Sequence, residues 1–283
     1  MKRASLRRRL VDLSMRGLLG VAVAVAIAPL VWILFDVARR GISAVKGLEF
    51  LTKGPPGDPS AVGGGVANGI IGTFLMVGIA TAIAVPVGIL GAVYLVEFSL
   101  GGRLASGVRF FADVMTGLPS IVFGIFVYSV IVIATGSFSA LSGALALALI
   151  MWPIVLRTSE EMLRLVPREV REGALALGVP RWRAVLRVIL PSAAAGITTG
   201  SLLALARAAG ETAPLLFTAL GNQFIAFRLD HPMSALSLEI FRQATTAYDA
   251  ANARAWAAAA TLIGIVLVAS VAARTLAARR RRA

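Results

Sequence analysis

The sequence contains no cysteine and only one histidine among its 283 residues. The absence of cysteine excludes a disulfide framework, a zinc–thiolate site and a cysteine nucleophile. The single histidine, His231, stands beside Pro232 and offers fewer ligands than a metal site needs. A G-x-x-x-x-G-K-[ST] loop is also missing from the sequence. We therefore expect no metal site, no cofactor and no ATP binding or hydrolysis by this chain.

Charged residues are scarce too, at 15% of the chain, against about 25% in a typical soluble domain. Hydrophobic residues make up 58% of the chain, and the mean hydropathy is +0.85. This composition indicates a membrane protein. The net charge of +14 would, taken alone, also suit a nucleic-acid-binding protein, so the distribution of the charges has to decide.

Uncharged runs indicate where the chain crosses the membrane. Residues 17–35 form a run of nineteen, which is enough for one helix across a ~30 Å hydrocarbon core. Residues 114–156 are uncharged over 43 positions, which suits two helices joined by a turn at Thr135–Gly143. We predict an all-α membrane protein with six transmembrane helices, at 17–35, 68–96, two within 114–156, 191–220 and 255–273.

The charges are distributed unevenly between the two sides of this topology. One side holds 20 basic and 7 acidic residues, whereas the other holds 7 basic and 6 acidic residues. By the positive-inside rule the basic side is cytoplasmic, so we expect both termini in the cytoplasm. The basic excess therefore reflects membrane topology and gives no support to nucleic-acid binding. The cytoplasmic segments are 1–16, 97–113, 157–190 and 274–283.

The chain divides into three parts. Residues 1–67 comprise a basic segment, the first helix and an external Pro/Gly loop; 68–276 form a five-helix core with a cytoplasmic loop at 157–190; and 277–283 are a basic tail. A cleaved signal peptide is the alternative for the start of the chain. Its apolar run is longer than the usual 7–15 residues, and no A-x-A site followed by a polar mature start is evident, so we expect a membrane helix. In the second external loop we expect an amphipathic helix at 234–244.

The cytoplasmic loop reads REGALALGVPRWRAVLRVILP from Arg171 to Pro191. Glu172 to Leu177 favours a helix, Gly178 is placed to end it, and Pro180 follows. We expect the next membrane helix to begin at Leu190–Pro191. This spacing resembles the coupling loop of bacterial ABC importer permeases, which has the form E-A-A, three residues, G, nine residues, I, one residue, L-P. The departures are Gly173 for the first Ala and Val188 for Ile.

The resemblance implies a role for this loop. In ABC importer permeases the short helix inserts into a cleft of the ATPase subunit. The matching residues here, which we expect to couple the chain to such a subunit, are Glu172, Gly173, Ala174, Gly178, Leu190 and Pro191. The alternative is an amphipathic loop that lies on the lipid headgroups.

Three further stretches resemble the permeases of phosphate importers within that family. They are FLTKGPPGDPSAVGGGVANGIIGT (Phe50–Thr73), TGLPSIVFGIFVY (Thr116–Tyr128) and RAAGETAPLLFTAL (Arg207–Leu220). The resemblance implies a type I ABC importer permease fold in the bacterial inner membrane. It also implies four kinds of partner: a sister permease, two ATPase subunits that bind ATP and Mg²⁺, an extracytoplasmic phosphate-binding protein, and membrane lipids.

Arg207 and Glu211 place two opposite charges within the predicted fifth span. At a spacing of four they would share one helix face. A charge near the bilayer centre costs at least about 2.5–3.5 kcal/mol, so both should face the bundle interior or a water-filled path. One interpretation is mutual neutralisation that ties the helix to its neighbours. The other is that Arg207 contacts a passing oxyanion, that Glu211 limits how tightly the ion is held, and that Thr212 adds a hydroxyl donor.

Three features of the sequence remain open. Pro214 either breaks the helix and frees backbone groups near the path or makes a simple packing kink. Gly196 and Gly200 form a small-residue face that packs either within this chain or against a second permease. Rival functions are an ABC permease for another oxyanion, such as molybdate or sulfate, and an ion-coupled secondary transporter, which would leave the cytoplasmic loop unexplained.

Overall fold

The computed structural model describes residues 6–45, 47–99 and 101–279, and the chain is helical with no β-strand within these ranges. Five helical segments are long and apolar enough to cross a membrane, and a sharply bent pair makes a sixth if it counts as one span. The structure therefore accommodates the six predicted spans. The five segments are Val11–Ala44, Ala67–Phe98, Ala140–Arg164, Arg181–Gly210 and Asp249–Thr275.

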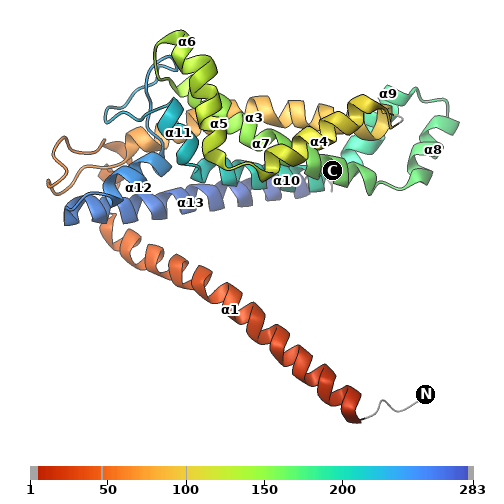
Figure 1. Ribbon diagram of the computed structural model, residues 1–283, viewed down its shortest axis with the longest axis horizontal. Helices are drawn as coiled ribbons and strands as arrows, with labels where there is room; N and C mark the ends of the chain where they lie inside the picture. The colour runs from red at the N-terminus through yellow and green to blue at the C-terminus, as the bar shows by residue number, and fades with distance from the viewer. Residues whose placement is uncertain (1–5, 46, 100, 280–283) are drawn as a thin grey trace.

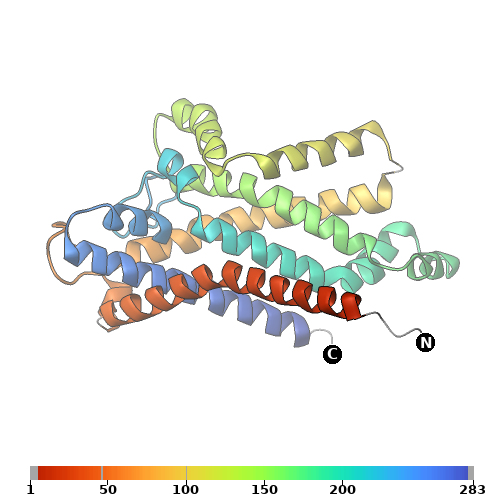
Figure 2. The same ribbon diagram turned by 60° about the horizontal axis from the view of Figure 1, so that its bottom comes forward.

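Figures 1 and 2 show these helices, apart from the first, running roughly side by side, with the short helices gathered at the two ends of the bundle. The α8 end carries α8 and α9, and the opposite α12 end carries α11 and α12. The longer helices are α1 (Leu6–Ala44), α3 (Ala67–Val93), α4 (Arg103–Gly117), α7 (Ala140–Arg164), α10 (Leu190–Gly210) and α13 (Asp249–Arg279). The shorter ones are α2 (Glu49–Thr52), α5 (Ser120–Val127), α6 (Ile133–Thr135), α8 (Arg168–Ala176), α9 (Arg181–Ala184), α11 (Ala213–Thr218) and α12 (Leu236–Ala244).

The core lies where α3, α7 and α10 meet. Ala80 on α3, Leu147 and Met151 on α7, and Ala204 on α10 are fully buried. Small residues let these helices approach closely, which is how helices associate where lipid removes the hydrophobic drive. A Cβ added to Gly88 of α3 would lie 2.8 Å from Val155 of α7. The predicted path residue Arg207 therefore lies on a helix that is packed into this core.

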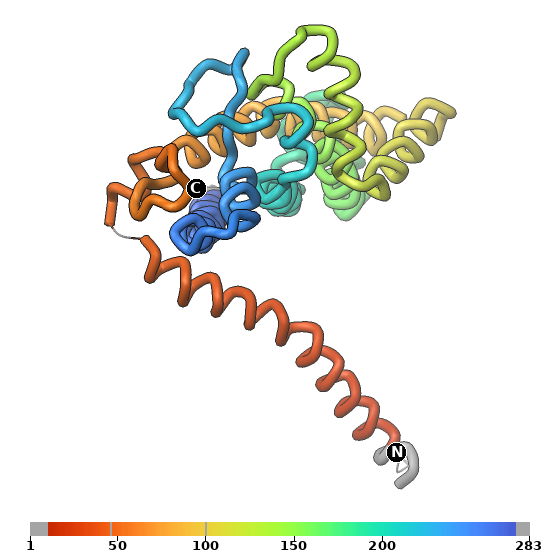
Figure 3. Tube along the Cα trace, turned by 60° about the vertical axis from the view of Figure 1, so that its left-hand side comes forward, coloured from red at the N-terminus to blue at the C-terminus, as the bar shows by residue number. Residues whose placement is uncertain are grey.

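Helix α1 stands apart from this core. Figures 1 and 3 show it running away from the bundle and touching it only near its C-terminal end. There Gly41 faces the backbone of Trp256 and the side chain of Ala260 on α13, and Arg40 stacks over the Trp256 ring at 5.0 Å. The residues from Val11 to Phe35 are exposed throughout. This apolar surface is suited to lipid or to a neighbouring membrane subunit.

The Pro/Gly loop is irregular, as predicted, but it is held firmly to α13. The buried guanidinium of Arg254 donates to the carbonyl oxygens of Pro59 (2.8 Å) and Ala61 (2.6 Å). Within the loop, the Ser60 hydroxyl and N–H donate to the Asp58 carboxylate, and these bonds hold the pKa of Asp58 below its ordinary value. The predicted amphipathic helix is confirmed as α12.

The turn predicted at Thr135–Gly143 is also confirmed, because α6 ends at Thr135 and α7 begins at Ala140. The N-cap Ser139 hydroxyl accepts the N–H of Ser142 at 3.1 Å, which explains why α7 starts there. Of the predicted basic tail 277–283, residues 280–283 lie outside the described residues, as do residues 1–5 of the basic start.

Candidate substrate path and coupling surface

The motif in the cytoplasmic-type loop forms a short exposed helix, α8, as predicted. Glu172 and Gly173 are exposed, whereas Ala174 is buried against the bundle. Gly178 has φ of +75°, and its N–H donates to the Leu175 carbonyl at 2.9 Å. That left-handed conformation suits glycine and ends the helix. The structure therefore presents α8 as a knob at the α8 end of the bundle, as Figure 1 shows.

Helix α10 begins at Leu190–Pro191, as predicted, but the helical span that contains it starts earlier. The span begins at Arg181, directly after Pro180, and runs to Gly210. Pro191 lacks an N–H and crowds the carbonyl four residues earlier, so it was expected to mark a helix start. The π-helical turn Val185–Ile189 precedes it instead and widens the helix, so the proline fits inside a longer span. Leu190 is partly buried and Pro191 is exposed.

Arg207 and Glu211 do not share one helix, which corrects the sequence prediction. Arg207 lies in the last turn of α10, whereas Glu211 follows the helix end in an extended conformation, with ψ of 127°. The two side chains still pair, with Arg207 Nε 3.4 Å from Glu211 Oε1. The Arg207 side chain is 53% exposed and the Glu211 side chain only 14%. Glu211 therefore points into the chain, while Arg207 reaches its surface.

Pro214 explains where α10 stops. In a continuous helix its ring would clash with the carbonyl of Gly210, which is the last residue of α10. The chain instead breaks at Glu211–Thr212 and restarts as α11, with Pro214 in its first turn. The freed Glu211 carbonyl accepts the Ser237 hydroxyl of α12 at 2.8 Å. Broken helices are tolerated in membranes when neighbours satisfy such freed backbone groups.

A second break lies between α4 and α5. Pro119 ends α4, and the helices on either side of Leu118–Pro119 meet at 106°. The helices that follow the two breaks are in contact, because a Cβ added to Gly124 of α5 would lie 2.6 Å from the Pro214 Cα of α11. We name these two segments, Gly117–Pro119 and Gly210–Thr212, the double break. Gly117 and Pro119 thus stand at a bend of 106°, which is sharper than a kink within one helix.

Arg207 lies at the double break. It lines a small pocket together with Thr116, Leu118 and Ser120 from the α4–α5 bend. Ile150 and Ile154 of α7 complete the wall behind it. Thr212, the third predicted path residue, is partly buried and precedes α11, and its carbonyl accepts the N–H of Leu215 at 3.1 Å. The structure therefore brings one half-exposed guanidinium, hydroxyl groups and interrupted backbone together, a combination suited to a small oxyanion.

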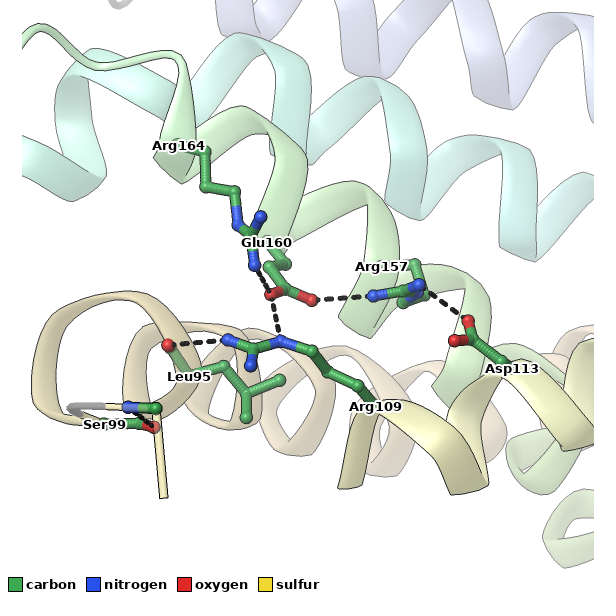
Figure 4. A network of polar contacts seen from close by, with 8 residues as sticks. Leu95, Ser99, Arg109, Asp113, Arg157, Glu160 and Arg164 are labelled. Carbon is green, nitrogen blue, oxygen red and sulfur yellow. Dashed lines mark hydrogen bonds and ion pairs between the residues drawn. The ribbon is translucent and has the colours of Figure 1, made fainter. Parts of the chain in front are cut away.

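A second group of charges, between α4 and the end of α7, was not predicted from the sequence. Glu160 is 3% exposed and accepts from Arg109 (2.7 Å), Arg164 (2.6 Å) and Arg157 (3.1 Å), as Figure 4 shows. Arg157 also pairs with Asp113 at 2.7 Å. We name Arg109, Asp113, Arg157, Glu160 and Arg164 the Glu160 cluster. It clamps α4 against α7 on the α8 side of Arg207.

A second ion pair, between Arg171 and Glu97, was also not predicted from the sequence. Arg171 at the start of the motif donates to the buried carboxylate of Glu97, 74 residues earlier in the chain. The signal in the sequence was weak: Glu97 directly ends a long uncharged run, and Arg171 directly precedes the Glu of the motif. Both were counted only as cytoplasmic charges, because spacing along the chain does not show pairing between distant segments.

The small-residue face of α10 packs within this chain. A Cβ on Gly196 would collide with the side chain of Met162, and one on Gly200 would collide with Thr158, both on α7. Of the two alternatives left open by the sequence, packing inside the chain is therefore the observed one. His231 is exposed, as expected, and pairs only with Asp230, at 3.4 Å, among the residues that the structure describes.

Comparison with known sequences gives consistent matches. The profile of the family "Binding-protein-dependent transport system inner membrane component" matches residues 84–282. The chain is 42% identical to the "Phosphate transport system permease protein PstA" of Pasteurella multocida, covering 94% of each chain. It is 45% identical to the protein of that name from Xylella fastidiosa strain 9a5c, over 84% of this chain and 82% of the relative. It is 42% identical to "Phosphate transport system permease protein PstA 1" of Mycobacterium tuberculosis H37Rv, over 98% of this chain and 92% of the relative.

Two solved structures share the fold. One shows inward-facing conformations of the MetNI methionine ABC transporter, with a TM-score of 0.54, 18% identity, and coverage of 77% of this chain and 93% of that chain. The other is a bacterial ABC transporter that imports the acidic polysaccharide alginate, with a TM-score of 0.53, 15% identity, and coverage of 96% and 99%. At these identities the likeness establishes the helical architecture alone.

Proposed function

Because the chain belongs to the family of binding-protein-dependent transport system inner membrane components, we propose that it is the membrane permease subunit of an ATP-driven phosphate importer. It is a multi-pass transport subunit and not an enzyme. The observation that carries the choice of substrate is Arg207, a half-exposed guanidinium at the double break, in a chain 42% identical to phosphate permeases. An importer of this family works with an ATPase and a binding protein.

The site suggests how an oxyanion would pass. Arg207 offers a fork of donors that matches two phosphate oxygens, and its contact with Glu211 at 3.4 Å is long enough to exchange. Glu211 keeps the guanidinium in place and competes with the ion for it, so the contact stays transient. Thr212 adds a hydroxyl near the same point. A conduit needs this balance, because an ion that is bound too firmly is not released.

The exposure of Arg207 also supports a second membrane subunit. In lipid a half-exposed guanidinium is costly, so a partner should cover this face and enclose the path between the two subunits. We propose a PstC-like sister permease in this position. The other proposed partners are two PstB-like ATPase subunits, which hold ATP and Mg²⁺, and a PstS-like phosphate-binding protein outside the membrane.

The α8 end would then be cytoplasmic and the α12 end external, with the protein in the inner membrane. This orientation follows the basic excess around α8 and places both termini in the cytoplasm. The exposed surface of α8, from Glu172 to Gly178, would dock on the ATPase. Closure of the ATPases on binding ATP would move α8 and switch the helices between inward-facing and outward-facing states.

The test is uptake of labelled phosphate in cells that lack their own copy of this subunit but hold all its partners. We expect the gene to restore uptake, with arsenate competing and with excess sulfate or molybdate having no effect. Competition by sulfate or molybdate would assign another oxyanion. Uptake that persists when the ATPase subunit carries an inactivating substitution would instead point to a secondary transporter.

A further inference from the structure

We propose that Arg171 is the positioning residue that transmits the motion of α8 to the transmembrane helices. The proposal rests on the function proposed above and assigns a part of its mechanism to one side chain. Arg171 lies in α8 itself and directly precedes Glu172 of the coupling motif. It does not touch the substrate path, so its role would be mechanical.

All three guanidinium nitrogens of Arg171 are used, each by a different acceptor. Nε donates to Glu97 Oε1 at 2.9 Å, NH1 to the Val166 carbonyl at 2.8 Å, and NH2 to the Leu163 carbonyl at 2.5 Å. Leu163 belongs to the last turns of α7, whose carbonyls have no partner inside the helix. One side chain therefore joins α8 to the end of α7 and to the segment that ends the second span.

The partner carboxylate is firmly placed. Glu97 is 5% exposed and lies in the π-helical turn Tyr94–Phe98, which continues α3. The same turn is held from the other side by Arg109, which donates to the Leu95 carbonyl at 3.1 Å and belongs to the Glu160 cluster. Figure 4 shows this second link. A pull on Arg171 would therefore act on a part of the bundle that is already clamped to α4 and α7.

The side-chain hydrogen bonds that α8 makes over its described length all come from Arg171. Within α8, which is described over its whole length, Ala174 is the one buried residue. Glu169, Glu172 and Leu175 are exposed, as the surface of a docking helix should be. An element that is held mainly by one multiply bonded arginine moves with the group that arginine binds.

The route from Arg171 to Arg207 runs through close helix contacts. The Leu163 carbonyl lies on α7, and Thr158 of the same helix meets Gly200 of α10. Helix α10 ends beside Arg207. Packed contacts of this kind pass on a displacement because the interior is close-packed. Position alone does not prove coupling, so the test must measure coupling itself.

The experiment uses the complete transporter in proteoliposomes, with binding protein, and measures labelled phosphate imported per ATP hydrolysed. For Arg171→Gln we expect this ratio to fall by about 2- to 30-fold, the range found for residues that carry coupling. Arg171→Lys should fall in between, because an ammonium cannot serve all three acceptors. Glu97→Gln should lower the ratio in the same direction. Arg168→Gln, an exposed arginine three residues earlier in α8, is the matched control and should leave the ratio unchanged.

A spectroscopic measurement separates transmission from mere stability. Because this chain has no cysteine, spin labels can be placed in it selectively through Leu177→Cys beyond α8 and Tyr94→Cys at the end of the second span. We expect their distance distribution to stay narrow through the ATP cycle and to broaden in Arg171→Gln. An unchanged transport ratio and an unchanged distribution in Arg171→Gln would overturn the proposal. An equal fall in import, ATP hydrolysis and assembled complex would overturn it too, because that result marks a purely structural residue.

Failure of the proposed function looks different. If the unsubstituted transporter hydrolyses ATP but imports no phosphate, the substrate assignment fails whatever Arg171 does. If it imports phosphate and Arg171→Gln keeps the normal ratio, only the role of Arg171 fails.

Discussion

Arg207 and Glu160 each pair with opposite charges inside the bundle, yet they are held very differently. Arg207 is half exposed, and its guanidinium makes one polar contact among the described residues, with Glu211 at 3.4 Å. Glu160 is 3% exposed and accepts from three arginines at 2.6 to 3.1 Å. A side chain with one long contact can turn toward a passing ion, whereas a side chain with several short contacts fixes two helices together. The first arrangement suits transport and the second suits the scaffold.

The largest effect is expected from Glu160→Gln. It leaves three arginines around a neutral side chain, so we expect a loss of about 3 kcal/mol of stability, the low end for breaking a buried pair, since the arginines can turn toward water. The melting temperature of the detergent-extracted protein and its phosphate uptake should fall together. Glu161→Gln, the exposed neighbour, is the control and should change neither. A normal melting temperature for Glu160→Gln would remove the structural role.

Arg207→Gln should separate function from stability. We expect phosphate uptake to fall by about 10- to 100-fold, the equivalent of losing one charge-assisted hydrogen bond, while the melting temperature stays within error. Arg207→Lys keeps the positive charge but loses the forked donors of the guanidinium, so its phosphate uptake should lie between that of the unsubstituted protein and that of Arg207→Gln. Arg187→Gln, an exposed arginine of the same span, serves as the control. Uptake at the normal rate with Arg207→Gln would contradict the assignment of the path.

Glu211→Gln should strengthen phosphate binding, whereas Arg207→Gln should weaken it. Without the competing carboxylate, Arg207 holds phosphate longer, so the maximal rate of uptake should fall a few-fold while half-saturation occurs at a lower phosphate concentration. The concentration dependence of uptake by the reconstituted transporter measures both quantities. A parallel fall in both rate and apparent affinity would indicate instead that Glu211 only supports the double break.

The smallest effect is expected from substitutions of two glycines in the coupling motif, Gly173 in α8 and Gly178 directly after it. Gly178→Ala places a side chain at φ of +75°, at a cost of about 1–2 kcal/mol, although there is open space around it. Gly173→Ala in α8 meets equally open space in a helical conformation and should be neutral or slightly stabilising. We expect weaker copurification of the ATPase only for Gly178→Ala. Equal copurification with both variants would show that the turn geometry does not matter for docking.

Much of the fold could be predicted from the sequence, because membrane spans depend on composition and length. The runs at 17–35 and 255–273 fall within α1 and α13, and the motif around Gly178 gave the exposed helix and its end correctly. Local rules failed where two neighbouring signals compete. Pro191 marks the start of α10, but a π-helical turn extends the span toward Arg181, and Pro214 stops α10 before Glu211, so the spacing of four did not mean one helix.

The candidate site was only half predictable for a related reason. Arg207 stood out because a charge inside an apolar run is costly. Its neighbours did not, since Thr116 and Ser120 are about ninety residues away in the chain and reach it only through the bend at Leu118–Pro119. Arg171 and Glu97 are ordinary charges at span ends until the fold brings them together. Pairing across distant segments is set by tertiary packing, which no single sequence displays.

The most direct measurement asks whether phosphate reaches the double break. Ser120→Cys introduces the one cysteine of this chain into the pocket that Arg207 lines, and its labelling by a charged thiol reagent can be followed by mass in the assembled transporter. We predict that phosphate slows the labelling, that sulfate does not, and that Arg207→Gln abolishes the protection. Labelling that phosphate leaves unchanged, in a variant that still imports phosphate, would contradict a path beside Arg207.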